Sequence, residues 1–220
     1  MLKTKQMGFT LVEIAIVMVI VGLLIGGVLK GQEMITNAKL KRIESDNAGL
    51  LAALYSYQDR YLQLPGDDAD AEGRFTIYAT DLTVNGDGDG AIGAGGDWDL
   101  PITTAWLAGT AETLKFFAHL KAAGLIAGGP MQADASRPSN AFGGPIGIQD
   151  GALGMSGQVT IFGGIDGPIA RILDGRLDDG DPDLGRVQSQ DVDSVSTMAA
   201  GGVAETAYDD ETSVNMAFRL

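Results

Sequence analysis

A single carboxylate, that of Glu13, lies near the start of an otherwise uncharged apolar run from Phe9 to Leu29. A carboxylate at membrane depth costs on the order of a few kcal/mol unless it finds a partner, so such residues are rare and usually functional. A partner arises if the chain is cleaved between Gly8 and Phe9, because the new amino group of Phe9 is a cation at the depth of Glu13 on the next copy. The pattern therefore predicts that Glu13 takes part in assembly between copies of the chain.

Acidic side chains alternate with glycine in a first loop, which reads NGDGDGAI from residue 85 to residue 92. Oxygen ligands at alternate positions, a glycine for the sharp turn and an apolar residue two positions later are typical of the first half of a calcium loop. The closing bidentate glutamate is missing, since Gly96 occupies its expected position. The predicted calcium ligands are Asn85, Asp87, Asp89 and Asp97.

A second acidic loop reads DDGDPDLGR from residue 178 to residue 186 and lacks the spacing of a calcium loop. It gives a weaker set of candidate calcium ligands, which are Asp178, Asp179, Asp181 and Asp183. The alternative is a solvated turn rich in aspartate and glycine. Calcium at either loop would offset repulsion between carboxylates, and no cofactor is otherwise required.

Patterns of enzyme chemistry are weak in this sequence. The sole histidine, His119, lies in a predicted amphipathic helix, where it is expected to be a satisfied core or boundary residue. There is no cysteine nucleophile, and carboxylates are too abundant for their pairing to be informative. The glycine pairs at residues 95, 128, 143 and 163 lack the GK[ST] ending of a phosphate loop and are predicted to be turns. No enzymatic activity is expected.

Glu13 is expected to lie on a long helix. Apolar residues continue beyond Leu29 at helical spacing, and the stripe consists of Ile43, Leu50, Leu54, Tyr57 and Tyr61. Pro65 and Gly66 predict that the helix ends near Leu64. Residues 9–29 would form its membrane-spanning and assembly part, and residues 30–64 an amphipathic continuation. Tyr55, Tyr57 and Tyr61 are expected to be core residues.

The acidic loops belong to a glycine- and aspartate-rich part of the chain, residues 65–220. Two helices are predicted there, at 111–123 and 168–177, together with strands at 158–162 and 213–220. A long helix packed on a small, mostly antiparallel sheet is an α+β fold. Residues 65–220 are therefore expected to form one globular domain.

The length, charge and lack of cysteine limit the possible functions. The 220 residues allow one membrane helix and one ordinary domain. A net charge of -14 disfavours direct binding to nucleic acid. Without cysteine, no disulfide can stabilise an exported domain.

The basic leader ending in Gly8, the sequence FTLVE from Phe9 to Glu13 and the apolar helix together resemble the prepilin signature of type IV pilins and type II secretion pseudopilins. The LPGD sequence at residues 64–67 resembles a pseudopilin-like subgroup. The resemblance implies that a prepilin peptidase removes residues 1–8 and methylates Phe9. It also implies fibres assembled with other pilin subunits by an inner-membrane platform.

The location and final role of the chain depend on this resemblance. Basic residues lie on both sides of the apolar run, at Lys3 and Lys5 before it and at Lys30, Lys39, Lys41 and Arg42 after it. The charge rule therefore leaves the orientation open. The resemblance implies an inner-membrane protein with its domain in the periplasm, which later enters a pilus or pseudopilus and reaches the cell surface.

Several alternatives compete with a pilus subunit. One is a pseudopilin of a type II secretion system, and another is a membrane-anchored minor subunit acting in adhesion or DNA uptake. An ordinary signal peptide fits poorly, because no A-x-A site follows Leu29. A plain single-span anchor would not require Glu13.

Overall fold

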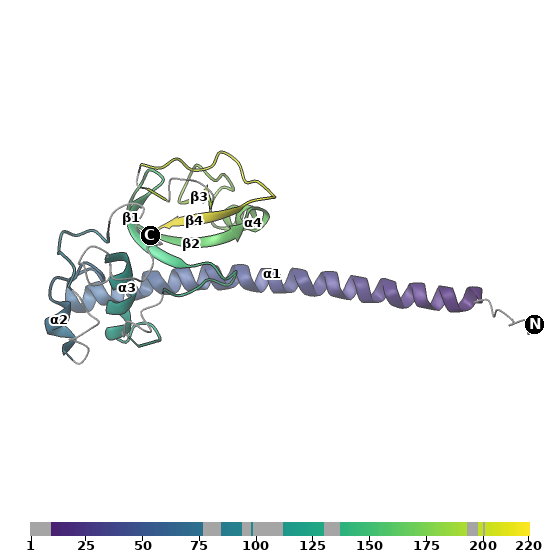
Figure 1. Cartoon of the computed structure of the whole chain (residues 1–220), viewed down its shortest axis with the longest axis horizontal. Helices are drawn as coiled ribbons and strands as arrows, with labels where there is room; N and C mark the ends of the chain where they lie inside the picture. Colours follow the sequence, from purple (N-terminus) through teal and green to yellow (C-terminus); the bar gives the residue numbers. More distant parts are fainter. Residues whose placement is uncertain are drawn as a thin grey trace, which may run out of the picture. The chain divides into compact units, whose positions relative to one another are not determined.

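The computed structural model of the chain describes residues 10–76, 85–93, 98, 112–129, 137–192, 198–199 and 201–220. The chain divides into two compact units, Met1–Lys41 and Arg42–Leu220. The long helix α1 (Leu11–Tyr61) contributes residues to both units (Figure 1). The predicted α+β fold, with a long apolar helix and a small antiparallel sheet, is confirmed.

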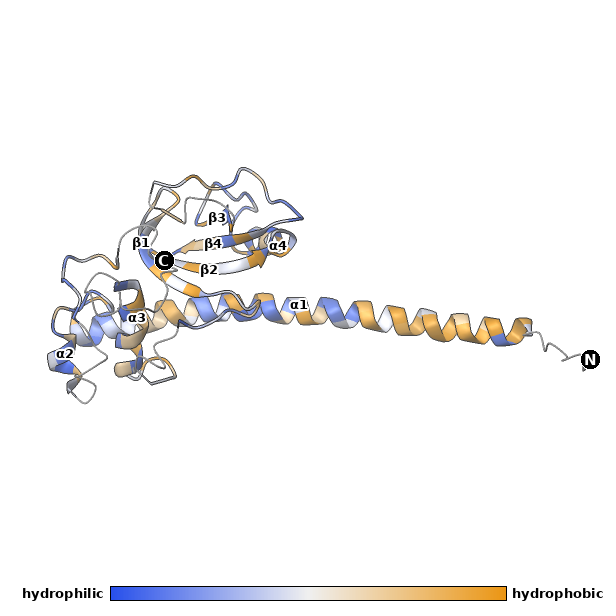
Figure 2. Ribbon diagram, viewed as in Figure 1, coloured by the Kyte–Doolittle hydropathy of each residue, from blue (hydrophilic) through white to orange (hydrophobic). Residues whose placement is uncertain are grey.

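The first unit contains the apolar part of α1. An 18-residue window of this helix has a mean hydropathy of 2.7 and is 0% buried. By length and composition the helix is able to cross a membrane, and Figure 2 shows the amino-terminal part of α1 as almost continuously apolar. Phe9, the predicted first residue of the membrane-spanning helix, lies outside the described part of the chain.

The carboxyl end of α1 lies three residues before the predicted one. The helix ends at Tyr61 because Leu62 adopts a left-handed backbone conformation with φ 57°. The N–H group of Leu62 still donates to the carbonyl oxygen of Gln58 at 2.8 Å. A left-handed residue is a common way to terminate a helix, so the chain turns before it reaches Pro65.

The predicted apolar stripe of α1 is largely confirmed in the second unit. Ile43, Leu50, Leu54 and Tyr57 are buried, and Tyr61 is half-buried. The prediction of a core position for Tyr55 was wrong, because this side chain is 55% exposed. Residues two positions apart face nearly opposite sides of a helix, so Tyr55 and Tyr57 cannot share a core.

The second unit contains a four-stranded antiparallel sheet in the order β1-β2-β4-β3. Its strands are β1 (Ile146–Ala152), β2 (Met155–Asp166), β3 (Val187–Asp191) and β4 (Ser213–Arg219). β2 and β4 were predicted, although β2 is longer than the 158–162 expected. β1 and β3 were missed because their polar and glycine residues hide the apolar alternation.

A tight turn and a bulge, both containing glycine, interrupt the regular pairing of this sheet. Leu153 and Gly154 both have positive φ, which gives the two-residue turn that joins β1 to β2. The prediction of a turn at Gly163 and Gly164 was wrong, since both lie inside β2 where its pairing with β4 shifts register. A bulge is a usual place for glycine within a strand.

Both faces of the sheet are covered. On one face Val159 and Ile161 belong to a buried cluster with Trp98 and Met198. On the other face the Thr160 hydroxyl donates to the side-chain oxygen of Asn47 on α1 at 2.5 Å. This alternation along β2 is the two-residue period of a strand.

The described part of the second unit contains three further helices. α3 (Glu112–Ala122) and α4 (Gly167–Leu177) match the predicted helices, and a short α2 (Ala71–Arg74) was not predicted. α3 contacts β1, and α4 contacts β2, β3 and β4. Pro168 lies in the first turn of α4, where a proline costs no helix hydrogen bond.

Candidate functional sites

Thr10 and Glu13 cap the amino end of α1 reciprocally. The Glu13 Oε2 atom accepts hydrogen bonds from the Thr10 N–H at 2.8 Å and from the Thr10 hydroxyl at 2.9 Å. The Glu13 N–H donates to the Thr10 hydroxyl oxygen at 3.3 Å. This is a capping box, which satisfies N–H groups that a helix leaves unpaired at its start. Sequence reasoning missed this role, although the T-x-x-E spacing is readable.

The other residues predicted at this end, Gly8 and Phe9, lie outside the described part of the chain. The roles assigned to them in cleavage and methylation, and to Glu13 in assembly, therefore stay predictions. Glu13 is the single charged residue among residues 10–29. Its carboxylate thus combines a local structural contact with an isolated charge on an apolar surface.

Asp67 organises the first acidic loop by accepting hydrogen bonds from the backbone of the loop. Its carboxylate is 2% exposed and accepts hydrogen bonds from the N–H groups of Gly88 at 2.7 Å, Asp89 at 3.0 Å and Gly90 at 2.9 Å. Burial raises the pKa of the Asp67 carboxyl, and the three N–H groups partly offset this. The loop is therefore wrapped around a buried carboxylate.

Glu112, at the start of α3, also accepts hydrogen bonds from the backbone of the first acidic loop. Its Oε1 accepts from the Asp87 N–H at 2.9 Å and its Oε2 from the Gly93 N–H at 3.0 Å. Burial also raises the pKa of the Glu112 carboxyl. The buried Lys115 adds a third contact, because its ammonium donates to the Asn85 carbonyl oxygen at 2.8 Å.

The structure brings together two of the four predicted ligands of the first loop. Carboxylate oxygens of Asp87 and Asp89 lie within 4.8 Å of each other and of Asp67 and Glu112. Asn85 turns its side-chain oxygen to the Glu72 N–H at 2.9 Å, and Asp97 lies outside the described residues. Asp67 and Glu112 were missed because they are remote in sequence. Calcium at this loop stays a prediction.

A second polar network is centred on Asp68, the residue that follows Asp67. The Tyr57 hydroxyl donates to Asp68 Oδ2 at 2.6 Å, and the Arg74 guanidinium donates to both Asp68 oxygens at 3.1 and 3.2 Å. Asp68 is 0% exposed. Burial alone would raise the pKa of Asp68, but the hydrogen bonds and the Arg74 charge lower it overall. The network ties α1 to the turn that follows it.

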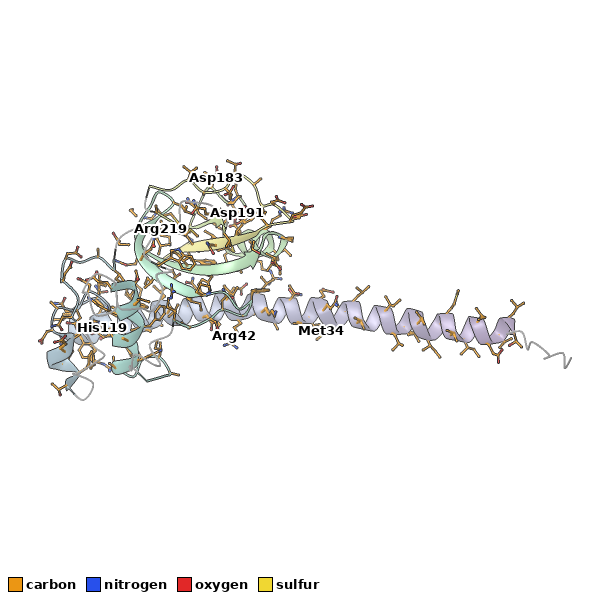
Figure 3. The ribbon with its side chains drawn as sticks, in the orientation of Figure 1. Met34, Arg42, His119, Asp183, Asp191 and Arg219 are labelled. Carbon is orange, nitrogen blue, oxygen red and sulfur yellow. The ribbon has the colours of Figure 1, made fainter. Side chains whose placement is uncertain are left out.

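His119 on α3 is a satisfied core residue, as predicted (Figure 3). Its side chain is 0% exposed, and its Nδ1 atom accepts a hydrogen bond from the Gly66 N–H at 2.9 Å. The ring stacks on Tyr57 with centroids 6.3 Å apart. His119 therefore links α3 to the LPGD turn.

In the second acidic loop, two of the four predicted residues join a residue that was not predicted. Carboxylate oxygens of Asp178 and Asp179 lie within 4.8 Å of each other and of Asp174 on α4. Asp181 and Asp183 are outside this cluster, and Asp183 is exposed at the surface (Figure 3). Helical spacing could have suggested Asp174, which lies one turn before Asp178.

Asp174 is the unusual member of this group. Its side chain is 0% exposed, and its Oδ2 accepts from the Tyr208 hydroxyl at 2.8 Å. Burial raises the pKa of the Asp174 carboxyl to about 6, although the Tyr208 hydroxyl and the Gly180 N–H lower it. Among the described residues, no hydrogen-bond partner lies at Oδ1.

An open groove of about 620 Å³ lies within the second unit. Its walls carry apolar residues such as Leu50 and Leu125 and charged residues of both signs, including Arg42, whose Nε lies 3.5 Å from the Asp46 carboxylate in the same wall.

Comparison with known proteins identifies the amino-terminal segment. Residues 3–29 match the model of the prokaryotic N-terminal methylation motif. This motif is the signature of type IV pilins and pseudopilins, so the predicted resemblance is confirmed. No curated protein and no solved structure matches the chain.

Proposed function

We propose that this pilin-like precursor is a structural subunit of a type IV pilus-like fibre, cleaved after Gly8, methylated at Phe9 and assembled from the bacterial inner membrane. The observation that carries the proposal is the exposed apolar surface of α1, which bears a single carboxylate near its start. The methylation motif covers the same residues and supports processing by a prepilin peptidase and assembly with other pilin subunits.

The apolar surface needs a covering. Large side chains are exposed all round the helix, with Leu11 at 91%, Leu23 at 74% and Met18 at 71%. Such a surface is stable in lipid before assembly and among neighbouring helices afterwards. Gly22 and Gly26 have open space beside them, which allows close approach of another helix.

Glu13 would pair with the Phe9 amino group of a neighbouring subunit. The capping contact to Thr10 does not prevent this, because a carboxylate offers about four lone-pair sites. Capping holds the carboxylate at the helix start, where the neighbouring amine would meet it. The charge would then set the axial register of the subunits and help to draw a new subunit from the bilayer.

The decisive experiment separates the charge of Glu13 from its capping contact. Glu13→Gln keeps a side chain that can complete a capping box but removes the charge. Cells making this variant should insert and process the chain normally but produce fewer or shorter fibres. Thr10→Ala is the matched control, since it removes the cap and keeps the charge. Normal fibres from Glu13→Gln would contradict the amine-pairing role.

Deletion of the gene distinguishes the machines that use such subunits. Loss of surface filaments or twitching supports a pilus, and loss of export of a secreted hydrolase supports the pseudopilin of a type II secretion system. The groove of about 620 Å³ within the second unit favours one further candidate, a membrane-anchored minor subunit that binds a ligand in adhesion or DNA uptake. In that case, filaments would persist while adhesion or uptake is lost.

A further inference from the structure

One oxygen of the buried Asp174 carboxylate, Oδ1, has no hydrogen-bond partner among the described residues. The side chain is fully buried, Oδ2 accepts from the Tyr208 hydroxyl at 2.8 Å, and the described residues place no donor at Oδ1. A buried acceptor without a partner costs free energy, and such a group in a folded protein calls for an explanation such as a bound ion.

Two more carboxylates surround this one. Oxygens of Asp178 and Asp179 lie within 4.8 Å of each other and of Asp174, a separation that a single cation can bridge. Asp178 already uses Oδ2 for the Val187 N–H at 3.0 Å, and Asp179 uses Oδ1 for an N–H two residues later at 2.9 Å. These contacts hold both carboxylates in place.

The position of the cluster increases the need for positive charge. Asp174 lies in the last turn of α4 and Asp178 is its carboxyl-terminal cap. The carboxyl end of a helix carries partial negative charge, which disfavours anions there. The Arg176 guanidinium of the same turn lies 3.9 Å from the Glu44 carboxylate.

We propose that Asp174, Asp178 and Asp179 bind a divalent cation, calcium, at the carboxyl end of α4. Calcium prefers carboxylate, carbonyl and water oxygens, and the exposed side of Asp179 gives it access from solvent. The ion fixes the loop of residues 178–187 between α4 and β3. Compared with the ligands predicted from the sequence, this site includes Asp174 and lacks Asp181 and Asp183. The proposal does not depend on the proposed role of the chain in a fibre.

The test is calcium binding by the full chain in detergent micelles, measured by isothermal titration after removal of metal with a chelator. Asp174→Asn keeps an acceptor for the Tyr208 hydroxyl and removes one ligand charge. Asp179→Asn removes a charge at an exposed position, where folding should be unaffected. Both variants should bind calcium at least tenfold more weakly than the parent chain.

Asp183→Asn is the matched control, because it removes the same charge from the same loop outside the cluster. It should bind calcium like the parent chain. A double variant of Asp87 and Asp89 to Asn reports on the first loop and should retain binding at α4. The proposal is overturned if the parent chain binds no calcium, or if Asp174→Asn and Asp179→Asn bind it as tightly as the parent.

Discussion

The Oε2 atom of Glu13 lies 2.8 Å from the backbone nitrogen of Thr10, so the one charged side chain of the apolar run is also part of the capping box of its helix. A residue with two roles has to be tested with substitutions that remove one role at a time. We expect Thr10→Ala to weaken the first turn by about 1 kcal/mol, which is typical of an N-cap threonine.

This loss should raise amide hydrogen exchange in residues 11–14 about fivefold in detergent micelles. Mass spectrometry of the exchanged peptides measures it. Thr36→Ala, in the middle of α1, serves as the control and should leave those amides unchanged. Unchanged exchange in Thr10→Ala would mean that the capping box does not persist in the micelle.

Gly8→Asp should block removal of the leader, because the methylation motif at residues 3–29 implies cleavage at the Gly8–Phe9 bond. Intact-mass measurement of the purified chain should find the eight leader residues retained and the methyl group missing. Thr4→Asp places the same charge in the leader away from the bond and should be processed. Cleavage of Gly8→Asp at the usual position would contradict the assignment.

Asp67→Asn should destabilise the second unit by about 1–3 kcal/mol, because an amide nitrogen cannot accept one of the buried N–H groups of the loop. Asp89→Asn removes the same charge from an exposed position of that loop and should cost less than about 0.5 kcal/mol. Thermal unfolding followed by near-ultraviolet circular dichroism compares the two.

The same measurement tests calcium at the first loop. In a chain that carries Asp174→Asn, the proposed α4 site is removed. A calcium-dependent midpoint in that background would support the predicted site around Asp87 and Asp89. Equal midpoints with calcium and with chelator would exclude a structural ion there.

Tyr57→Phe should make the chain more sensitive to acid. The pKa of Asp68 is lowered in the folded state, so its contribution to stability is present above the unfolded pKa of about 4 and is lost as pH falls through the folded value. Removing the Tyr57 hydroxyl raises that folded pKa. The loss at neutral pH should be about 1.5–3 kcal/mol and should shrink as Asp68 is protonated.

Acid titration of the folded signal measures this effect, and the pH of half-unfolding should be higher in Tyr57→Phe than in the parent chain. Tyr55→Phe is the control, since the Tyr55 side chain is 55% exposed. Identical acid midpoints for the two variants would contradict the role of the Tyr57 hydroxyl.

Gly66→Ala should destabilise the second unit by about 1–3 kcal/mol because the backbone there is in a left-handed conformation. The φ angle is 95°, and a Cβ atom would lie 2.7 Å from the Glu112 carbonyl oxygen. Gly175→Ala in α4 meets nothing within 4 Å and should be neutral or slightly stabilising. Thermal midpoints of the two variants decide the question, and equal values would refute the strain.

The sequence by itself determined the features that depend on neighbours along the chain. The apolar run, the single charge of Glu13, the approximate end of α1 and the helices near residues 112–122 and 167–177 all follow from local periodicity and from proline and glycine. The helix ends were approximate because Leu62, which no rule marks as a terminator, adopts the left-handed conformation.

The tertiary structure alone decided which carboxylates meet. Asp67 and Glu112 are 45 residues apart, yet both accept N–H groups of the loop at residues 87–93, and Asp174 joins Asp178 and Asp179 while Asp181 does not. Sequence spacing does not predict which carboxylates lie close together, because this depends on how α3 and α4 pack. The physical reason is that burial, which gives Asp67 and Asp174 their altered pKa values, is a property of the folded chain and of no local pattern.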